Sequence, residues 1–159
     1  MRIEKEIYSP LILTVPDDAA LFSVLNPSKK ITKKIIMENN INFYCYKDLA
    51  SGIAFFRFKD SMNYGCIEGL KRCYIPIDIV KKYHNLIDLI TNILIEGYCV
   101  IMPVNKGSID FYGKNVEGTH QVFIYGIDTQ KQILLCKDFE ANCFVKFEVS
   151  FEEVEFKEL

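Results

Sequence analysis

The second half of the chain carries one helical pattern followed by a succession of short strand patterns, and this order decides the fold class. Apolar residues recur at spacings of three and four from Leu86 to Leu94. Asn85 can cap the start of this helix, and Gly97 can supply the left-handed residue that ends it. We therefore expect a helix over residues 85–96 that packs against a sheet and buries Leu86, Leu89, Ile90 and Ile93.

Strand patterns follow this helix, each bounded by turn residues; they cover residues 98–105, 120–126, 132–138 and 144–149. The polar centre of residues 127–131 predicts a tight hairpin, and Ser150 with Glu153 matches a capping box for a last short helix. Earlier in the chain the patterns predict a brief helix over 19–25, an irregular middle over 61–79 and two strands, 43–46 and 53–58. Helices followed by meandering strands indicate a single α+β domain over residues 1–159 with a mostly antiparallel sheet, and not a doubly wound parallel one.

Charge and composition narrow the classes of function. Lysine and arginine number 19 against 21 aspartates and glutamates, so no basic field is present to attract a nucleic acid. No apolar run approaches the roughly 18 residues of a membrane span, and charges within Met1–Glu6 interrupt a secretory signal, so we expect a cytoplasmic protein without membrane contact. The six cysteines lack the spacing of a zinc site and would stay reduced in the cytosol; we expect no metal and no cofactor.

The predicted hairpin would bring together two residues that could act in catalysis, His120 and Asp138. If Gly126 opposes Gln132 across the turn, His120 lies directly opposite Asp138 with both side chains on one face. A carboxylate beside an imidazole fixes the tautomer and supports a general base. The alternative is that His120 starts a strand facing solvent and Asp138 begins a turn. For His84, a capping or surface role is favoured over a ligand role.

Four segments in order carry a resemblance to a known family: Ile95–Val104, a loop with Phe111-Tyr112, His120–Asp128 and Leu134–Phe139. This order of a Gly-Tyr strand, a His-x-x-x-x-Tyr-Gly-x-Asp strand and an Asp-containing strand resembles peptidase C39-like domains. It is most similar to the N-terminal domains of the butirosin biosynthesis protein H family in thiotemplate antibiotic clusters. The resemblance extends from Leu86 to Phe151, and the first half of the chain is only loosely similar.

The resemblance implies a papain-like fold, with His120 as general base and Asp138 as the residue that orients it. Such chemistry needs a cysteine at the N-terminus of the first core helix. The corresponding stretch, residues 15–25, contains no cysteine: Pro16 or a neighbour stands there, and we expect His120 to face Pro16, Asp17 or Asp18. A second placement is Cys45, because residues 45–51 are similar to a Cys-Tyr-x-x-x-Leu-Ala-Ser motif of the family, although Cys45 itself sits in a strand pattern. Cys66 and Cys73 are weaker candidates.

Two classes of function follow from the resemblance. The first is an accessory or degenerate C39-like protein of nonribosomal peptide biosynthesis that binds an acyl or peptidyl carrier protein or a synthetase. The alternative is a cysteine-dependent acyl or peptidyl transferase that moves a carrier-bound thioester to an amine, and it requires a thiol within hydrogen-bond reach of His120. A peptidase that trims leader peptides is less favoured. We expect the accessory role, because the matching helix lacks the nucleophile.

Overall fold

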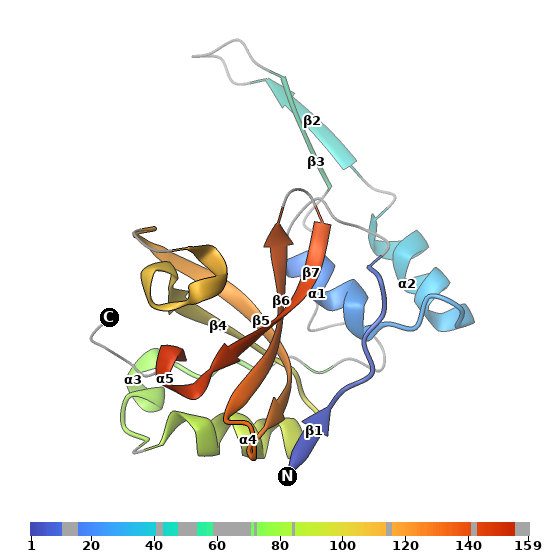
Figure 1. Ribbon diagram of the computed structural model, residues 1–159. Helices are drawn as coiled ribbons and strands as arrows, with labels where there is room; N and C mark the ends of the chain where they lie inside the picture. The colour runs from blue at the N-terminus through green and yellow to red at the C-terminus, as the bar shows by residue number, and fades with distance from the viewer. Residues whose placement is uncertain are drawn as a thin grey trace. The chain divides into compact units, whose positions relative to one another are not determined.

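The computed structural model describes residues 1–10, 16–40, 43–47, 54–58, 71, 73–83, 85–113, 116–140 and 143–154, and it describes the side chains of these residues except 16–18, 36–40, 43–47, 54–58 and 140 (Figure 1). The chain divides into two compact units. The first consists of Met1–Leu25 and Ile77–Leu159, and the second of Asn26–Pro76. The single domain expected over residues 1–159 stays a prediction.

An antiparallel sheet forms the first unit, with strands β1 (Arg2–Glu4), β4 (Val100–Asn105), β5 (Thr119–Asp128), β6 (Ile133–Glu140) and β7 (Cys143–Ser150). Its order is β1-β5-β6-β7, and β4 also pairs with β5. One edge of β5 is therefore shared: β4 pairs along residues 119–124, and β1 pairs along residues 126–128. The expected α+β class with an antiparallel sheet is confirmed, whereas the papain-like fold stays a prediction. Strand β1 was not foreseen, because it is short and charged.

The helical elements of this unit are α1 (Pro16–Val24), α3 (Ile77–Val80), α4 (Leu86–Ile95), α5 (Phe151–Val154) and the 3₁₀ turns η2 (Lys106–Ser108) and η3 (Asp110–Tyr112). Helix α4 has the predicted ends: the Asn85 side chain accepts a hydrogen bond from the Asp88 backbone N–H, and Gly97 has φ 95°. Its fully buried residues are Ile90 and Leu94, while Leu86, Leu89 and Ile93 are half-buried. No described helix is long and apolar enough to cross a membrane.

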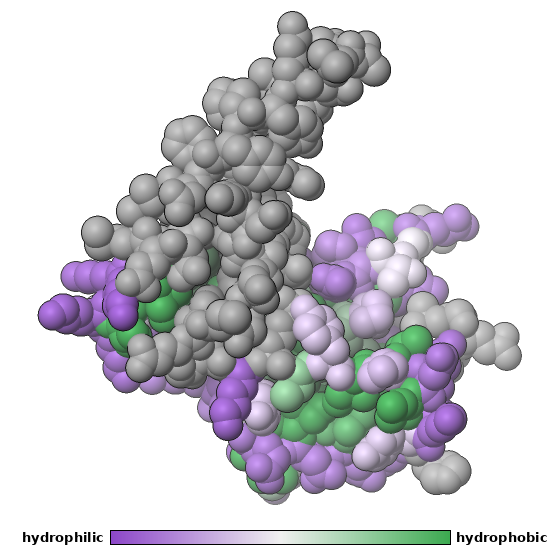
Figure 2. Space-filling model, turned by 180° about the vertical axis from the view of Figure 1, so that it is seen from behind, coloured by the Kyte–Doolittle hydropathy of each residue, from purple (hydrophilic) through white to green (hydrophobic). Residues whose placement is uncertain are grey.

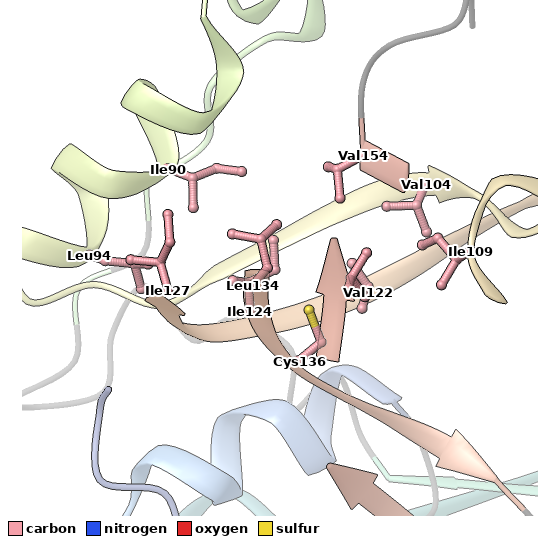
Figure 3. Close-up of a cluster of buried hydrophobic side chains, with 11 residues drawn as sticks. Ile90, Leu94, Val104, Ile109, Val122, Ile124, Ile127, Leu134, Cys136 and Val154 are labelled. Carbon is pink, nitrogen blue, oxygen red and sulfur yellow. The ribbon is translucent and has the colours of Figure 1, made fainter. Parts of the chain in front are cut away.

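Each face of the sheet carries its own apolar cluster, because alternate residues of a strand point to opposite faces. Val122, Ile124 and Cys136 pack with Ile90 and Leu94 of α4, and Figure 3 shows helix α1 on the other side of the sheet from this cluster. On that other side, Ala20 of α1 packs with Phe123, Tyr125 and Leu135. We call these the α4 face and the α1 face.

At Gly126, β5 lies unusually close to both of its neighbouring strands, β1 and β6. The pairing of β5 with β6 shifts between Ile124 and Gly126, which marks a β-bulge. A Cβ atom at Gly126 would come within 2.7 Å of the Ile3 carbonyl oxygen and 2.8 Å of Leu135 Cδ1. Only glycine lets β1 lie against β5 at this point, so the bulge and the edge strand depend on the same residue.

The second unit contains helix α2 (Lys30–Asn40) and a two-stranded antiparallel sheet of β2 (Phe43–Lys47) and β3 (Ala54–Phe58). The two predicted strands are confirmed, and Cys45 lies in β2 opposite Phe56. The apolar run 31–37, for which the sequence indicated no definite structure, lies within α2. Most of the predicted irregular middle is outside the described residues, and its last part contains the start of α3.

Candidate active site

His120 lies near the start of β5 on the α4 face. It pairs with Val104 of β4, and the pairing of these strands is continuous from Thr119 to Ile124. His120 therefore shares a face with Val122 and Ile124, both members of the α4-face cluster. Of its side chain, 28% remains exposed, so the ring is in contact with solvent.

The pairing register between β5 and β6 differs from the expected one. Gly126 pairs with Leu135 and not with Gln132, and beyond the bulge Phe123 pairs with Lys137. The prediction that His120 lies directly opposite Asp138 is therefore wrong: the continued register places Asp138 opposite Val122, diagonal to His120. The shift near the site is an even number of residues, so both side chains still lie on one face. A diagonal neighbour is within reach of a long or aromatic side chain.

Asp138 is almost completely buried, and described donors satisfy both of its carboxylate oxygens. His120 Nε2 lies 2.6 Å from Asp138 Oδ2, and the Tyr112 hydroxyl donates a hydrogen bond to the same oxygen. The other oxygen, Oδ1, accepts a hydrogen bond of 2.7 Å from the Phe139 backbone N–H. With 2% of the residue exposed, these donors replace the water that the carboxylate loses on folding. The predicted proximity of His120 and Asp138 is thus present, and their catalytic roles stay predictions.

The carboxylate selects the tautomer of His120. A neutral imidazole that donates from Nε2 to Asp138 carries its lone pair on Nδ1. Among the described residues, none forms a hydrogen bond with Nδ1. The arrangement therefore leaves the basic nitrogen available, which is the requirement for accepting a proton from another group.

Tyr112 is the site residue whose role the sequence did not reveal. It ends turn η3, where Ile109 is buried and Phe111 stacks on Phe147 of β7 with ring centroids 3.8 Å apart. Burial raises the pKa of Tyr112, and the hydrogen bond to Asp138 and the charge of Asp138 raise it further, so the phenol stays protonated as a donor. The only signal was an aromatic pair in a glycine-punctuated loop, and such a pair does not predict contact with β6.

Glu153 connects η3 to the end of β7. Its Oε1 accepts a 2.7 Å hydrogen bond from the Asp110 backbone N–H, and its Oε2 accepts one of 2.6 Å from the Ser150 backbone N–H. The second bond confirms the predicted capping box, and the first extends it to the turn that positions Tyr112. Burial of Glu153 opposes its ionisation, but these hydrogen bonds outweigh burial and lower the pKa of the carboxyl.

The described thiols are poor partners for His120. None of Cys73, Cys99, Cys136 and Cys143 forms a hydrogen bond with it. Cys136 lies two residues before Asp138 on the same face, but burial, with the charges of Glu153 and Asp138, raises the pKa of this thiol. Burial also raises the pKa of Cys99, to about 11. Both thiols therefore resist forming the thiolate that a nucleophile needs.

The remaining candidates from the sequence lie elsewhere or outside the description. Cys45 lies within strand β2 of the second unit and not at the start of a helix. Cys66 and His84 are outside the described residues. Helix α1 begins at Pro16, and the side chains of Pro16, Asp17 and Asp18 are not described, so their expected position before His120 stays a prediction. Ala20, one turn along, packs on the opposite face of the sheet.

Among the described residues, no group of three or more histidine, cysteine, aspartate or glutamate side chains could hold a metal ion. Comparison with protein-family models, with curated proteins and with solved structures gives no significant match to this chain.

Proposed function

We propose that this protein is an accessory, degenerate C39-like protein of nonribosomal peptide biosynthesis, which binds a carrier protein or synthetase and performs no chemistry at His120. The observation that carries the proposal is the state of the His120–Asp138 pair. Asp138 is satisfied by His120, Tyr112 and a backbone N–H, and no described thiol is bonded to the imidazole. Cys45, the cysteine that the sequence favours most as nucleophile, lies in a strand.

The pair has a structural use without catalysis. Asp138 of β6 holds two other segments in place. Its carboxylate contacts His120 at the start of β5 and accepts a hydrogen bond from Tyr112 in turn η3. Buried polar groups that are fully hydrogen-bonded specify one packing arrangement, and breaking such a group costs several kcal/mol. Retention of both residues is therefore compatible with a protein whose nucleophile has been lost.

A partner-binding role also has a surface to support it. Within the first unit, large apolar side chains remain exposed at Ile77, Ile79 and Tyr83, and exposed Lys81 and Lys82 lie between them in the chain. Figure 2 shows hydrophobic surface bordered by hydrophilic residues on the face seen from behind. Apolar residues beside cations complement a partner that presents apolar side chains within an acidic surface. We propose that the carrier protein or synthetase has such a surface.

The chemical half of the proposal is tested by incubating the protein with an acyl thioester of N-acetylcysteamine and measuring its intact mass. The accessory role predicts no acyl adduct, and it predicts that Cys45→Ala leaves the biological activity unchanged. An adduct that maps to Cys45 and disappears in Cys45→Ala, with the fold intact, would replace this proposal with the transferase.

The binding half is tested with purified carrier proteins and synthetase domains encoded beside this gene. Replacing Ile79 by Asp places an anion in the apolar surface and should weaken binding by about tenfold or more, as expected for an interface hot spot. His120→Gln should leave the dissociation constant unchanged. Equal binding by wild type and Ile79→Asp would contradict the proposed surface.

One observation favours the transferase as a second candidate. Asp138 holds Nε2 and leaves Nδ1 with its lone pair, as a general base requires. In that reaction Nδ1 would take the thiol proton while sulfur attacks the thioester carbonyl. The acyl–sulfur bond to the carrier would break, and the proton would pass to the departing carrier thiolate. Attack by an amine on the acyl-enzyme would then form the amide and release the cysteine.

A further inference from the structure

Two lysines lie directly opposite each other on neighbouring strands of the first unit. Lys137 of β6 pairs with Lys146 of β7, and the pairing along these strands is continuous from Ile133 to Glu140. Directly opposed residues project from the same face of the sheet, here the α1 face that also carries Leu135. Like charges in this arrangement destabilise a sheet, so the pair needs a compensating group.

Aromatic rings, and not carboxylates, lie against both cations. Lys137 Nζ lies 4.9 Å from the centroid of the Phe144 ring, and Lys146 Nζ lies 5.2 Å from that of Tyr125. Among the described residues, neither lysine forms an ion pair. A cation over a ring gains a modest electrostatic attraction, but the ring supplies no negative charge to cancel the repulsion between the two lysines. Within the described part of the chain, no ion pair offsets this repulsion, although Glu148 projects from the same face two residues from Lys146.

Lys137 is also buried, with 5% of the residue exposed. It lines a small pocket with Ala20, Ile101, Gln121, Phe123, Asp138 and Phe144. Lys137 is not among the described hydrogen-bond and ion-pair partners of Asp138, which are His120, Tyr112 and the Phe139 backbone. Burial, together with the charge of Lys146, lowers the pKa of Lys137.

We propose that this pocket binds an oxyanion, the phosphate or carboxylate group of a small ligand, at the ammonium group of Lys137, and that Lys146 on the same face adds its positive charge from outside the pocket lining. The anion would accept a charge-assisted hydrogen bond from Lys137, and its negative charge would offset the repulsion between Lys137 and Lys146. The Gln121 amide at the pocket can donate a further hydrogen bond. The pocket is small, so it suits a single oxyanion group whose remainder extends outward. The inference is independent of the function proposed above, because His120 lies on the other face of the sheet.

The test compares phosphate, acetate and chloride at matched ionic strength, measuring the thermal midpoint of the whole protein against anion concentration. A ligand that binds the folded state raises the midpoint in a saturable way. We expect saturable stabilisation by phosphate or by acetate, and the stronger of the two identifies the class of oxyanion. Lys137→Met should weaken the dissociation constant by on the order of tenfold or more, as for loss of a charged hydrogen bond. Lys131→Met, at an exposed lysine of the β5–β6 turn, is the matched control and should bind like wild type.

Because Lys137 is buried, its replacement could alter the fold, and the exposed Lys146 provides a second variant. Lys146→Met should weaken binding several-fold while leaving the circular dichroism spectrum unchanged. Equal midpoint shifts in wild type and Lys146→Met, or shifts that rise without saturation in all three salts, would overturn the site. Phosphate titration followed by ³¹P NMR provides a readout that does not depend on stability.

Discussion

Tyr112 and His120 donate hydrogen bonds to the same carboxylate oxygen of Asp138. The two donors come from different places, a 3₁₀ turn and the start of a strand, and their rings meet edge to face with centroids 5.5 Å apart. The acid that orients His120 is therefore itself held by a phenol, and the geometry of the pair depends on turn η3.

The first prediction concerns this phenol. Replacing Tyr112 by Phe keeps the ring contacts and removes one donor to the carboxylate, so the free energy of unfolding should fall by about 1–3 kcal/mol. Urea denaturation measures the change. Tyr98→Phe is the control, because the Tyr98 hydroxyl has no described hydrogen bond, and it should change stability by less than about 0.5 kcal/mol. Equal effects in the two variants would show that the Tyr112 hydroxyl contributes nothing.

The second prediction compares two buried aspartates of the sheet. Hydrogen-bond donors face both carboxylate oxygens of Asp138. In Asp138→Asn an NH2 group, which cannot accept these bonds, replaces one oxygen, so we expect the free energy of unfolding to fall by about 3 kcal/mol. In Asp128, one oxygen accepts from the Gln130 and Lys131 backbone N–H groups, while the other lies 3.9 Å from Arg2. Asp128→Asn can retain both turn bonds and should cost clearly less. Denaturant titrations of both variants decide the order, and a larger loss for Asp128→Asn would contradict this account.

The third prediction is a pH dependence through Glu153. Because folding lowers the pKa of this carboxyl, its contribution to stability is fully present above the unfolded value of about 4.3 and is lost as pH falls through the lower folded value. The difference in unfolding free energy between wild type and Glu153→Gln should be largest at neutral pH and shrink on acidification. Glu152→Gln, at an exposed neighbour without a described hydrogen bond, is the matched control for the removal of one acidic side chain. A difference independent of pH would rule out the assigned linkage.

The fourth prediction ranks the thiols. Among the four cysteines whose side chains are described, iodoacetamide at neutral pH should alkylate the exposed Cys73 and Cys143 first, and Cys136 only as the protein unfolds, because burial raises the pKa of Cys136 and shields it. Peptide mass spectrometry after short labelling, with and without urea, measures the order. Rapid native labelling of Cys136 would mean that the α4 face opens and that a thiol can approach the His120–Asp138 pair.

Local sequence patterns predicted the elements whose stabilising contacts are close in the chain. Asn85 caps α4 three residues ahead of its hydrogen-bond donor, and Glu153 caps the last helix through Ser150 in the same way. The strands on either side of the β5–β6 turn followed from apolar alternation. These features depend on periodicity and on short-range hydrogen bonds, and both can be read along the chain. The same-face placement of His120 and Asp138 came instead from an assumed register that is two residues off near the site, and it holds because that shift is even.

Tertiary structure alone decided how those elements meet. The turn pairs Asp128 with Ile133, three residues from the expected register, and the bulge at Gly126 reduces this difference to two, so Asp138 lies diagonal to His120 and not opposite it. Strand β1 pairs with β5 although more than a hundred residues separate them. The contact of Tyr112 with Asp138 requires η3 to pack over β6 and β7, which no pattern within the loop encodes. Such contacts are set by packing between segments distant in sequence, where one added residue in a strand moves every later pair. The residue types thus determined which chemistry was possible, and the packing of β5, β6 and η3 determined which atoms meet.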